Sequence, residues 1–153
     1  MVNTATARTA TTASATGLGS DALLLLARLA LAAVFALSGW GKVTNPDAFA
    51  GMLTNRFGLP GAYPLALLAA GVEFLGGIAL ILGLKVRWAA LALVFFTGIA
   101  TYLAHRYWTF PAEQVMNQYN HFMKNVAIIG GLLAVIATGA GRWSIDSIFN
   151  RSA

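Results

Sequence analysis

Two ionisable side chains, Arg28 and Glu73, lie inside long apolar stretches of the chain. A charged group at bilayer depth costs several kcal/mol unless it faces a partner or water, so each one indicates a functional or packing site. Arg28 lies three residues from the centre of its stretch, and Glu73 lies near the centre of its own. In antiparallel helices this offset is about 4.5 Å, which an arginine side chain can span. We therefore predict a buried ion pair between Arg28 and Glu73.

The alternative is that these two side chains do not meet. Arg28 would then extend to the lipid headgroups, and Glu73 would stay protonated in an apolar site. In that case each side chain interacts only with its own neighbours, and the two residues form no common site.

Further polar side chains gather at the expected outer ends of the apolar stretches; they are Lys42, His105, His121, Lys124 and Asn125. If the stretches close into a bundle, these groups rim a pocket with Glu73 at its floor. Such a pocket suits a quinone or another small polar ring, with His105 and Glu73 exchanging its protons. The alternative is that His and Lys mark the membrane interface, where they accumulate without a ligand.

The same residues give little support to a metal site or to haem. His105 and His121 are separated by a polar segment that we expect to be a flexible loop, so they lack the fixed spacing of helical ligands. Because the chain has no cysteine, it cannot perform thiol chemistry itself. The ten Lys and Arg residues are scattered between apolar stretches, which disfavours nucleic acid as a partner. No phosphate loop or nucleophile elbow is present.

The composition predicts the elements that must position these side chains. Apolar residues make up 58% of the 153 residues and charged residues 10%, against about 45–50% and about 25% in soluble proteins. Four apolar stretches approach the roughly 20 residues that cross a bilayer; they are residues 22–40, 63–84, 88–103 and 122–140. We predict an all-α integral membrane four-helix bundle formed by residues 21–153.

Two other segments have simpler predictions. Residues 1–20 are rich in Thr, Ala and Ser without apolar periodicity, so we expect a disordered tail; a cleaved signal peptide is the less favoured alternative, because the following apolar run is too long. Residues 46–57 begin with Pro46 and end before Gly58, which predicts a short amphipathic helix on the outer membrane surface. A plain loop is the alternative.

Small residues recur at helical spacing on two of the predicted spans. One strip contains Ala69, Glu73 and Gly77. The other two strips, on the last span, contain Ala127, Gly131 and Val135, and Gly130, Ala134 and Thr138. Small residues let membrane helices approach closely, so we predict that the second and fourth spans contact each other.

Charge also predicts an orientation. The tight connection from Gly83 to Arg87 carries Lys85 and Arg87, and positive charges in short loops favour the cytoplasmic side. Both chain termini are therefore predicted to be cytoplasmic.

The order of these features resembles the DoxX family of small bacterial and archaeal membrane proteins. The resemblance rests on Arg28, Ser38-Gly39-x-x-Lys42, Glu73-x-x-Gly76-Gly77, Gly83-Leu84-x-x-Arg87, His105, Lys124-Asn125, Gly130-Gly131 and Gly139-x-Gly141-x-x-Ser144-x-Asp146. It extends over nearly everything after residue 20.

The resemblance implies a four-helix membrane bundle in a bacterial cytoplasmic (inner) membrane. It also implies a membrane or soluble redox protein as partner, in quinone-linked or oxidative-stress systems. Our first hypothesis is therefore a subunit or accessory of a membrane redox system, with a quinone as the cofactor considered. The second is a nonenzymatic scaffold in which the polar residues only hold helices together. The third is a small proton-coupled transporter acting as a dimer, which is less favoured because the first span bears an arginine and the acid is on the second span.

Overall fold

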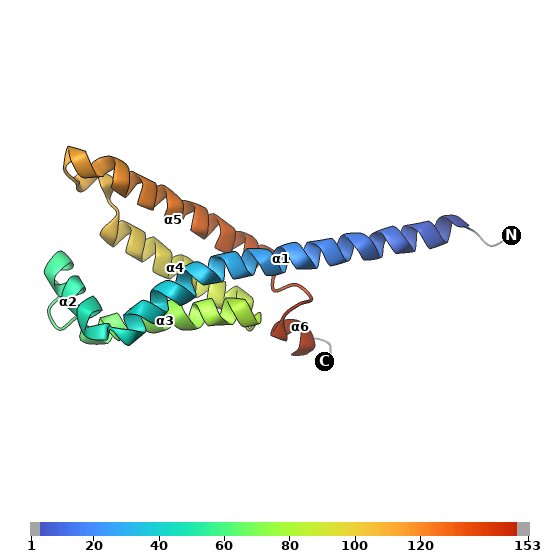
Figure 1. Cartoon of the computed structure of the whole chain (residues 1–153), viewed down its shortest axis with the longest axis horizontal. Helices are drawn as coiled ribbons and strands as arrows, with labels where there is room; N and C mark the ends of the chain where they lie inside the picture. Colours follow the sequence, from blue (N-terminus) through green and yellow to red (C-terminus); the bar gives the residue numbers. More distant parts are fainter. Residues whose placement is uncertain (1–3, 150–153) are drawn as a thin grey trace.

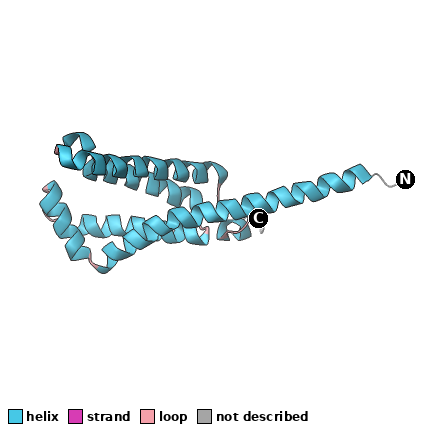
Figure 2. Cartoon of the chain, turned by 45° about the horizontal axis from the view of Figure 1, so that its top comes forward, coloured by secondary structure: helices cyan, strands magenta, loops and turns pink. Residues whose placement is uncertain are grey.

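The computed structural model describes residues 4–149, and these residues form helices joined by short connections without strands (Figures 1 and 2). Helix α1 spans Thr4–Thr44, α2 Pro46–Phe57, α3 Tyr63–Leu82, α4 Val86–Ala104, α5 Ala112–Thr138 and α6 Ile145–Phe149, with a 3₁₀ turn, η1, at Tyr107–Thr109. The all-α prediction is confirmed.

Four of these helices are long and apolar enough to cross a membrane. They are α1 from Gly19 onward, α3, α4 together with η1, and α5. Their ends agree with the four predicted spans to within a few residues, except that α5 begins ten residues earlier than the span predicted from residue 122. Many large apolar side chains on these helices are exposed, as expected for surfaces that contact lipid. The chain is an integral membrane protein.

Helix α1 is longer than the sequence predicted. It begins at Thr4, and its part before residue 20 projects beyond the other helices (Figure 1); disorder of this tail stays a prediction. Residues 1–3 lie outside the described residues, and a domain boundary at residue 20 stays a prediction.

Helix α2 has the bounds that its sequence signals predict. Pro46 occupies the first turn, and Gly58 ends the helix with φ of 66°, a left-handed conformation that favours glycine. Ala50 and Leu53 are buried with Ala62 and Ala66 at the start of α3. The segment is therefore a helix folded against the bundle; its position relative to a membrane surface stays a prediction.

Helices α1 and α3 pack closely because glycine on each lets the other backbone approach. A Cβ atom on Gly39 would lie 2.5 Å from the backbone nitrogen of Phe74, and one on Gly77 would lie 2.6 Å from that of Ala36. No side chain fits at either position. These two contacts fix the register of the antiparallel pair.

The predicted contact between the second and fourth spans is wrong. Gly77 of α3 faces Ala36, and a Cβ on Gly131 of α5 would meet the side chain of Leu31, so both helices use small residues against α1. Helix α5 otherwise packs mainly against α4. The apolar core between the four spans consists of Ala32, Phe35, Leu80, Val86, Ala90, Leu93, Leu132 and Val135.

We call the two ends of the bundle the Lys85 end, which contains the α3–α4 turn, and the His105 end, which contains α2 and η1. At the Lys85 end the chain after α5 returns beneath the bundle, and α6 lies beside the α3–α4 turn (Figure 1). The amide of Asp146 donates to the carbonyl of Gly83. The Ser144 hydroxyl accepts a hydrogen bond from the Ser147 amide and thereby caps the last turn.

Candidate functional site

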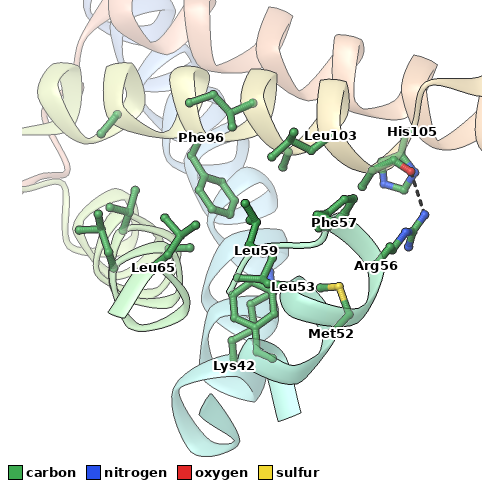
Figure 3. Close-up of a pocket in the computed structure, with 18 residues that line it drawn as sticks. Lys42, Met52, Leu53, Arg56, Phe57, Leu59, Leu65, Phe96, Leu103 and His105 are labelled. Carbon is green, nitrogen blue, oxygen red and sulfur yellow. Dashed lines mark hydrogen bonds between the residues drawn. The ribbon is translucent and has the colours of Figure 1, made fainter. Parts of the chain in front are cut away.

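A cavity of about 530 Å³ lies between α2, α3 and α4 (Figure 3). Its walls are almost entirely apolar, and its polar side chains are Lys42, Arg56 and His105. The wall from Ala92 to His105 follows α4 for thirteen residues, or about 20 Å of helix. The cavity therefore runs from the middle of the bundle to the His105 end.

The cavity opens sideways onto a surface that is expected to face lipid. Leu65 and Leu68 of α3 and Ile99 and Leu103 of α4 line it, and all four side chains are also exposed on the outside of the bundle. A lipophilic molecule can therefore reach the cavity from the bilayer without crossing water.

Lys42 supplies the polar group at the deep part of the cavity. Its ammonium group pairs with the carboxylate of Glu73 and also hydrogen-bonds the hydroxyl of Ser38 at 3.1 Å. The rings of Phe49 and Phe96 lie 5.2 and 5.7 Å from the Nζ atom, within the range of cation–π attraction. Glu73 is 4% exposed and lies behind Lys42. The arrangement offers a ligand a hydrogen-bond donor that is held in place by a buried acid.

Arg56 and His105 supply the polar groups at the other end of the cavity. The Arg56 guanidinium donates to the carbonyl of Ala104 at 3.0 Å, which connects α2 to the end of α4 (Figure 3). Its guanidinium carbon also lies 5.6 Å from the ring centre of Phe57. Sequence reasoning missed Arg56, although its position at the end of a predicted amphipathic helix could have indicated it.

His121, Lys124 and Asn125 do not line the cavity. They lie on α5, on the other side of His105 from the cavity, in a polar cluster. The rings of His105 and His121 stack with centroids 4.9 Å apart, and Lys124 Nζ is 3.4 Å from His121 Nδ1. Asn125 donates to the Thr101 hydroxyl at 2.8 Å. Of the predicted rim, only Lys42 and His105 reach the cavity.

The expectation of a flexible loop before His121 is wrong. The segment from Ala112 to Asn120 is the first part of α5, which begins after Pro111. Helical order lets Gln118 Oε1 lie 2.8 Å from His105 Nδ1 and brings the two imidazoles together. Within residues 4–149, however, no group of three or more His, Asp or Glu side chains could hold a metal ion.

The predicted Arg28–Glu73 ion pair is also wrong. Arg28 is fully buried at the Lys85 end and donates to the carbonyls of Ala140 and Trp143, the second at 2.7 Å. Glu73 adjoins Phe74, which faces Gly39, whereas Arg28 precedes Gly39 by eleven residues, or about 16 Å along α1. Comparing the centres of the apolar stretches placed the helices in the wrong register, because the close contacts at Gly39 and Gly77 set the register of α1 against α3.

Asp146 is a further structural residue at the Lys85 end. Its carboxylate accepts hydrogen bonds from the backbone amides of Lys85 at 2.7 Å and Val86 at 3.0 Å. These are free donors at the start of α4, and a carboxylate stabilises such a helix end. The Asp21 carboxylate accepts a hydrogen bond from the backbone amide of Arg142, in the connection between α5 and α6, at 2.9 Å.

Comparison with known proteins agrees with this architecture. Residues 23–106 match the DoxX family, and residues 66–151 also match the SURF4 family. No solved structure matches the chain.

Three relatives are informative. The inner membrane protein YqjF of Escherichia coli (strain K12) is 35% identical over 134 residues, which cover 86% of this chain and 95% of that protein. The inner membrane protein YphA of the same organism is 30% identical over 130 residues, covering 85% and 92%. The surfeit locus protein 4 homolog of Schizosaccharomyces pombe is 29% identical over 68 residues, covering 43% and 22%. The extent of the family match and the coverage of YqjF show that the chain belongs to the DoxX family.

Proposed function

We propose that this protein binds a quinone, or a lipophilic ring of similar polarity, in the cavity between α2, α3 and α4. In this role it serves as a membrane subunit or accessory of a redox system. The observation that carries the proposal is the Lys42–Glu73 pair at the deep part of an apolar cavity that opens toward lipid. A quinone has carbonyl oxygens that accept hydrogen bonds and a long apolar tail, and the cavity offers a donor and an apolar exit for them.

The chemistry of the site supports this ligand class over a charged one. Lys42 can donate to a ring carbonyl, while Glu73 balances its charge, so a neutral acceptor suits the deep part of the cavity. His105, at the other end, supplies an imidazole whose ring nitrogens can donate or accept a hydrogen bond. Electrons would come from or go to a protein partner, because the chain has no cysteine for thiol redox chemistry.

We place the protein in a bacterial inner membrane, as the names of YqjF and YphA state for those relatives. Lys85, Arg87 and Arg142 lie at or beside the Lys85 end of the bundle, which favours a cytoplasmic position for that end. The chain termini would then be cytoplasmic too.

Direct binding tests the proposal. The purified protein in lipid nanodiscs is titrated with a short-tailed quinone, and binding is followed by calorimetry. Ala69→Phe places a ring in the cavity and should abolish binding, because Ala69 is part of its wall. The matched control is Ala134→Phe on the exposed surface of α5, which should bind like the wild type. Equal binding by both variants, or none by the wild type, would refute a quinone site here.

A scaffold without a ligand is the second candidate, and one observation favours it. Arg28 and Asp146 hydrogen-bond backbone groups at the Lys85 end and do not line the cavity. Their role is to hold the chain after α5 against the rest of the bundle. If the protein acts only as a scaffold, blocking the cavity with Ala69→Phe will leave the cellular phenotype unchanged.

A further inference from the structure

The hydroxyl of Thr97 is buried in the bundle without a hydrogen-bond partner among the described residues. Its side chain is 5% exposed. Thr101 and Thr138 donate to the carbonyl four residues earlier, but Thr97 does not. Burying a hydroxyl without a partner is destabilising, so this group needs an explanation beyond packing.

Thr97 begins a strip of polar side chains on one face of α4. Thr97, Thr101 and His105 follow one another at intervals of four residues, the spacing of one helix face. Asn125 of α5 donates to the Thr101 hydroxyl, and Gln118 hydrogen-bonds His105. The strip is therefore polar from the interior to the His105 end, where His121 stacks on His105 and contacts the exposed Lys124.

The interior end of the strip lies at the level of Glu73. A Cβ on Gly76 would lie 2.9 Å from the Leu93 side chain, so these residues face each other across α3 and α4. The two helices are antiparallel, and Glu73 and Thr97 each lie about one turn from that contact in the same direction. Lys42 agrees with this placement, since its Nζ pairs with Glu73 and lies 5.7 Å from the ring of Phe96.

We propose that Thr97, Thr101 and His105 line a water-mediated proton path between Glu73 and the His105 end of the bundle. Successive side chains are about 6 Å apart along α4. A hydrogen bond spans about 2.8 Å, so one water molecule between each pair completes the path. The hydroxyl of Thr97 is then the group that holds the innermost water.

The transfer is a simple exchange of one proton. A proton from water at the His105 end enters the path and protonates the Glu73 carboxylate, and it returns the same way; no electron moves and no bond to carbon changes. The biological use of this path rests on the proposed function, because reduction of a bound quinone consumes protons. The path itself operates without a quinone.

The charged and titratable groups around the path lie on α1 to α5. Lys42 of α1 faces Glu73, while α4 contributes the neutral Thr97 and Phe96 at that level. His105 faces Gln118 and His121 of α5. From α2, Arg56 binds the carbonyl of the adjoining Ala104. Protonation of Glu73 will weaken its pairing with Lys42, and the path does not alter that equilibrium; it sets only the rate.

The test is the rate at which Glu73 takes up a proton. The full chain in nanodiscs, without quinone, is subjected to a rapid drop in pH, and the carboxylic C=O band is followed by time-resolved infrared spectroscopy. Glu73→Gln identifies the band that belongs to Glu73. Thr97→Val and Thr101→Val should slow its appearance about tenfold or more, with its final amplitude unchanged.

Matched controls separate the path from structural effects. Thr138→Val removes a hydroxyl that makes the same bond as Thr101 but on the exposed surface of α5, and it should leave the rate unchanged. Thr97→Val should unfold at the same temperature as the wild type or higher, because it removes an unpaired buried hydroxyl. Slower uptake in this variant therefore cannot come from a damaged fold.

Two results would overturn the proposal. One is a Thr97→Val variant that protonates Glu73 as fast as the wild type. The other is the lack of any Glu73 band over the pH range in which the protein stays folded. Thr97 does not line the cavity, so quinone binding to Thr97→Val should match the wild type. Slow protonation of Glu73 in Thr97→Val, together with a wild type that does not bind quinone, would support the path and refute the proposed function.

Discussion

Glu73 of α3 pairs with Lys42 of α1 in the interior of the bundle, and Lys42 is also one of the three polar side chains that line the cavity. The pair thus connects the helix packing with the candidate ligand site. Lys42 and Glu73 meet because of the register of α1 against α3, in which Gly39 faces Phe74. A change to either charged residue is expected to affect both stability and binding.

Removing one member of this pair should destabilise the protein more than removing both. Glu73→Ala leaves the Lys42 ammonium in an apolar site, and we expect a loss of about 2–4 kcal/mol, the lower value reflecting the partial exposure of Lys42. The double variant Lys42→Met with Glu73→Leu should return close to wild-type stability. Thermal unfolding in detergent, analysed as a double-mutant cycle, measures the coupling.

The exposed Glu113 at the start of α5 is the control for a lost carboxylate. Glu113→Ala should change stability by no more than about 0.5 kcal/mol. If Glu73→Ala behaves like Glu113→Ala, the ion pair has no structural role. Under the proposed function, the stable double variant should still fail to bind quinone.

Two glycines of α3 should respond oppositely to the same substitution. Gly77→Ala places a methyl group about where the backbone of Ala36 lies, so it should force α1 and α3 apart and cost about 1–3 kcal/mol. Gly71→Ala meets no atom within 4 Å and should be neutral or stabilising by up to about 1 kcal/mol. Unfolding temperatures of the two variants are sufficient to test the packing.

Arg28 should hold the chain after α5 against the bundle. Arg28→Met leaves the carbonyls of Ala140 and Trp143 without their donor. We expect hydrogen–deuterium exchange at residues 139–149 to become faster, with little change in α4. Arg28→Lys should rescue this only in part, because an ammonium group lacks the two-pronged geometry of guanidinium.

The control for Arg28 is Arg142→Gln. Arg142 is mostly exposed and its Nε lies 3.8 Å from Asp21, a surface pair worth about 0–1 kcal/mol. Its loss should leave the exchange at residues 143–149 near the wild-type rate. Equal effects of the two substitutions would contradict a specific role for Arg28.

Asp146 should stabilise the start of α4. Asp146→Ala removes the acceptor for the amides of Lys85 and Val86, and loss of such a cap costs about 0.5–2 kcal/mol. The expected result is faster amide exchange at residues 85–88. Asp47→Ala, in the first turn of α2, is the control and should leave residues 85–88 unaffected.

The sequence by itself determined the class of the protein and most helix bounds, because these depend on local properties. Apolar length defined the four spans, and Pro46 and Gly58 defined α2. A polar composition misled the prediction for residues 112–120, since helix formation there depends on packing of α5 against α4 and η1 rather than on apolar length. The sequence shows the spacing of Thr97, Thr101 and His105. It does not show that this face of α4 is buried, and the spacing indicates a polar path only if it is.

Only the tertiary structure decided which polar groups meet. The register of α1 against α3 is set by the close contacts at Gly39 and Gly77. Gly39, which faces Phe74 next to Glu73, lies eleven residues from Arg28. The carbonyls that bind Arg28 belong to a backbone segment after α5, whose return beneath the bundle has no side-chain signature. Long-range pairing depends on how helices slide and rotate against each other, which local patterns do not specify.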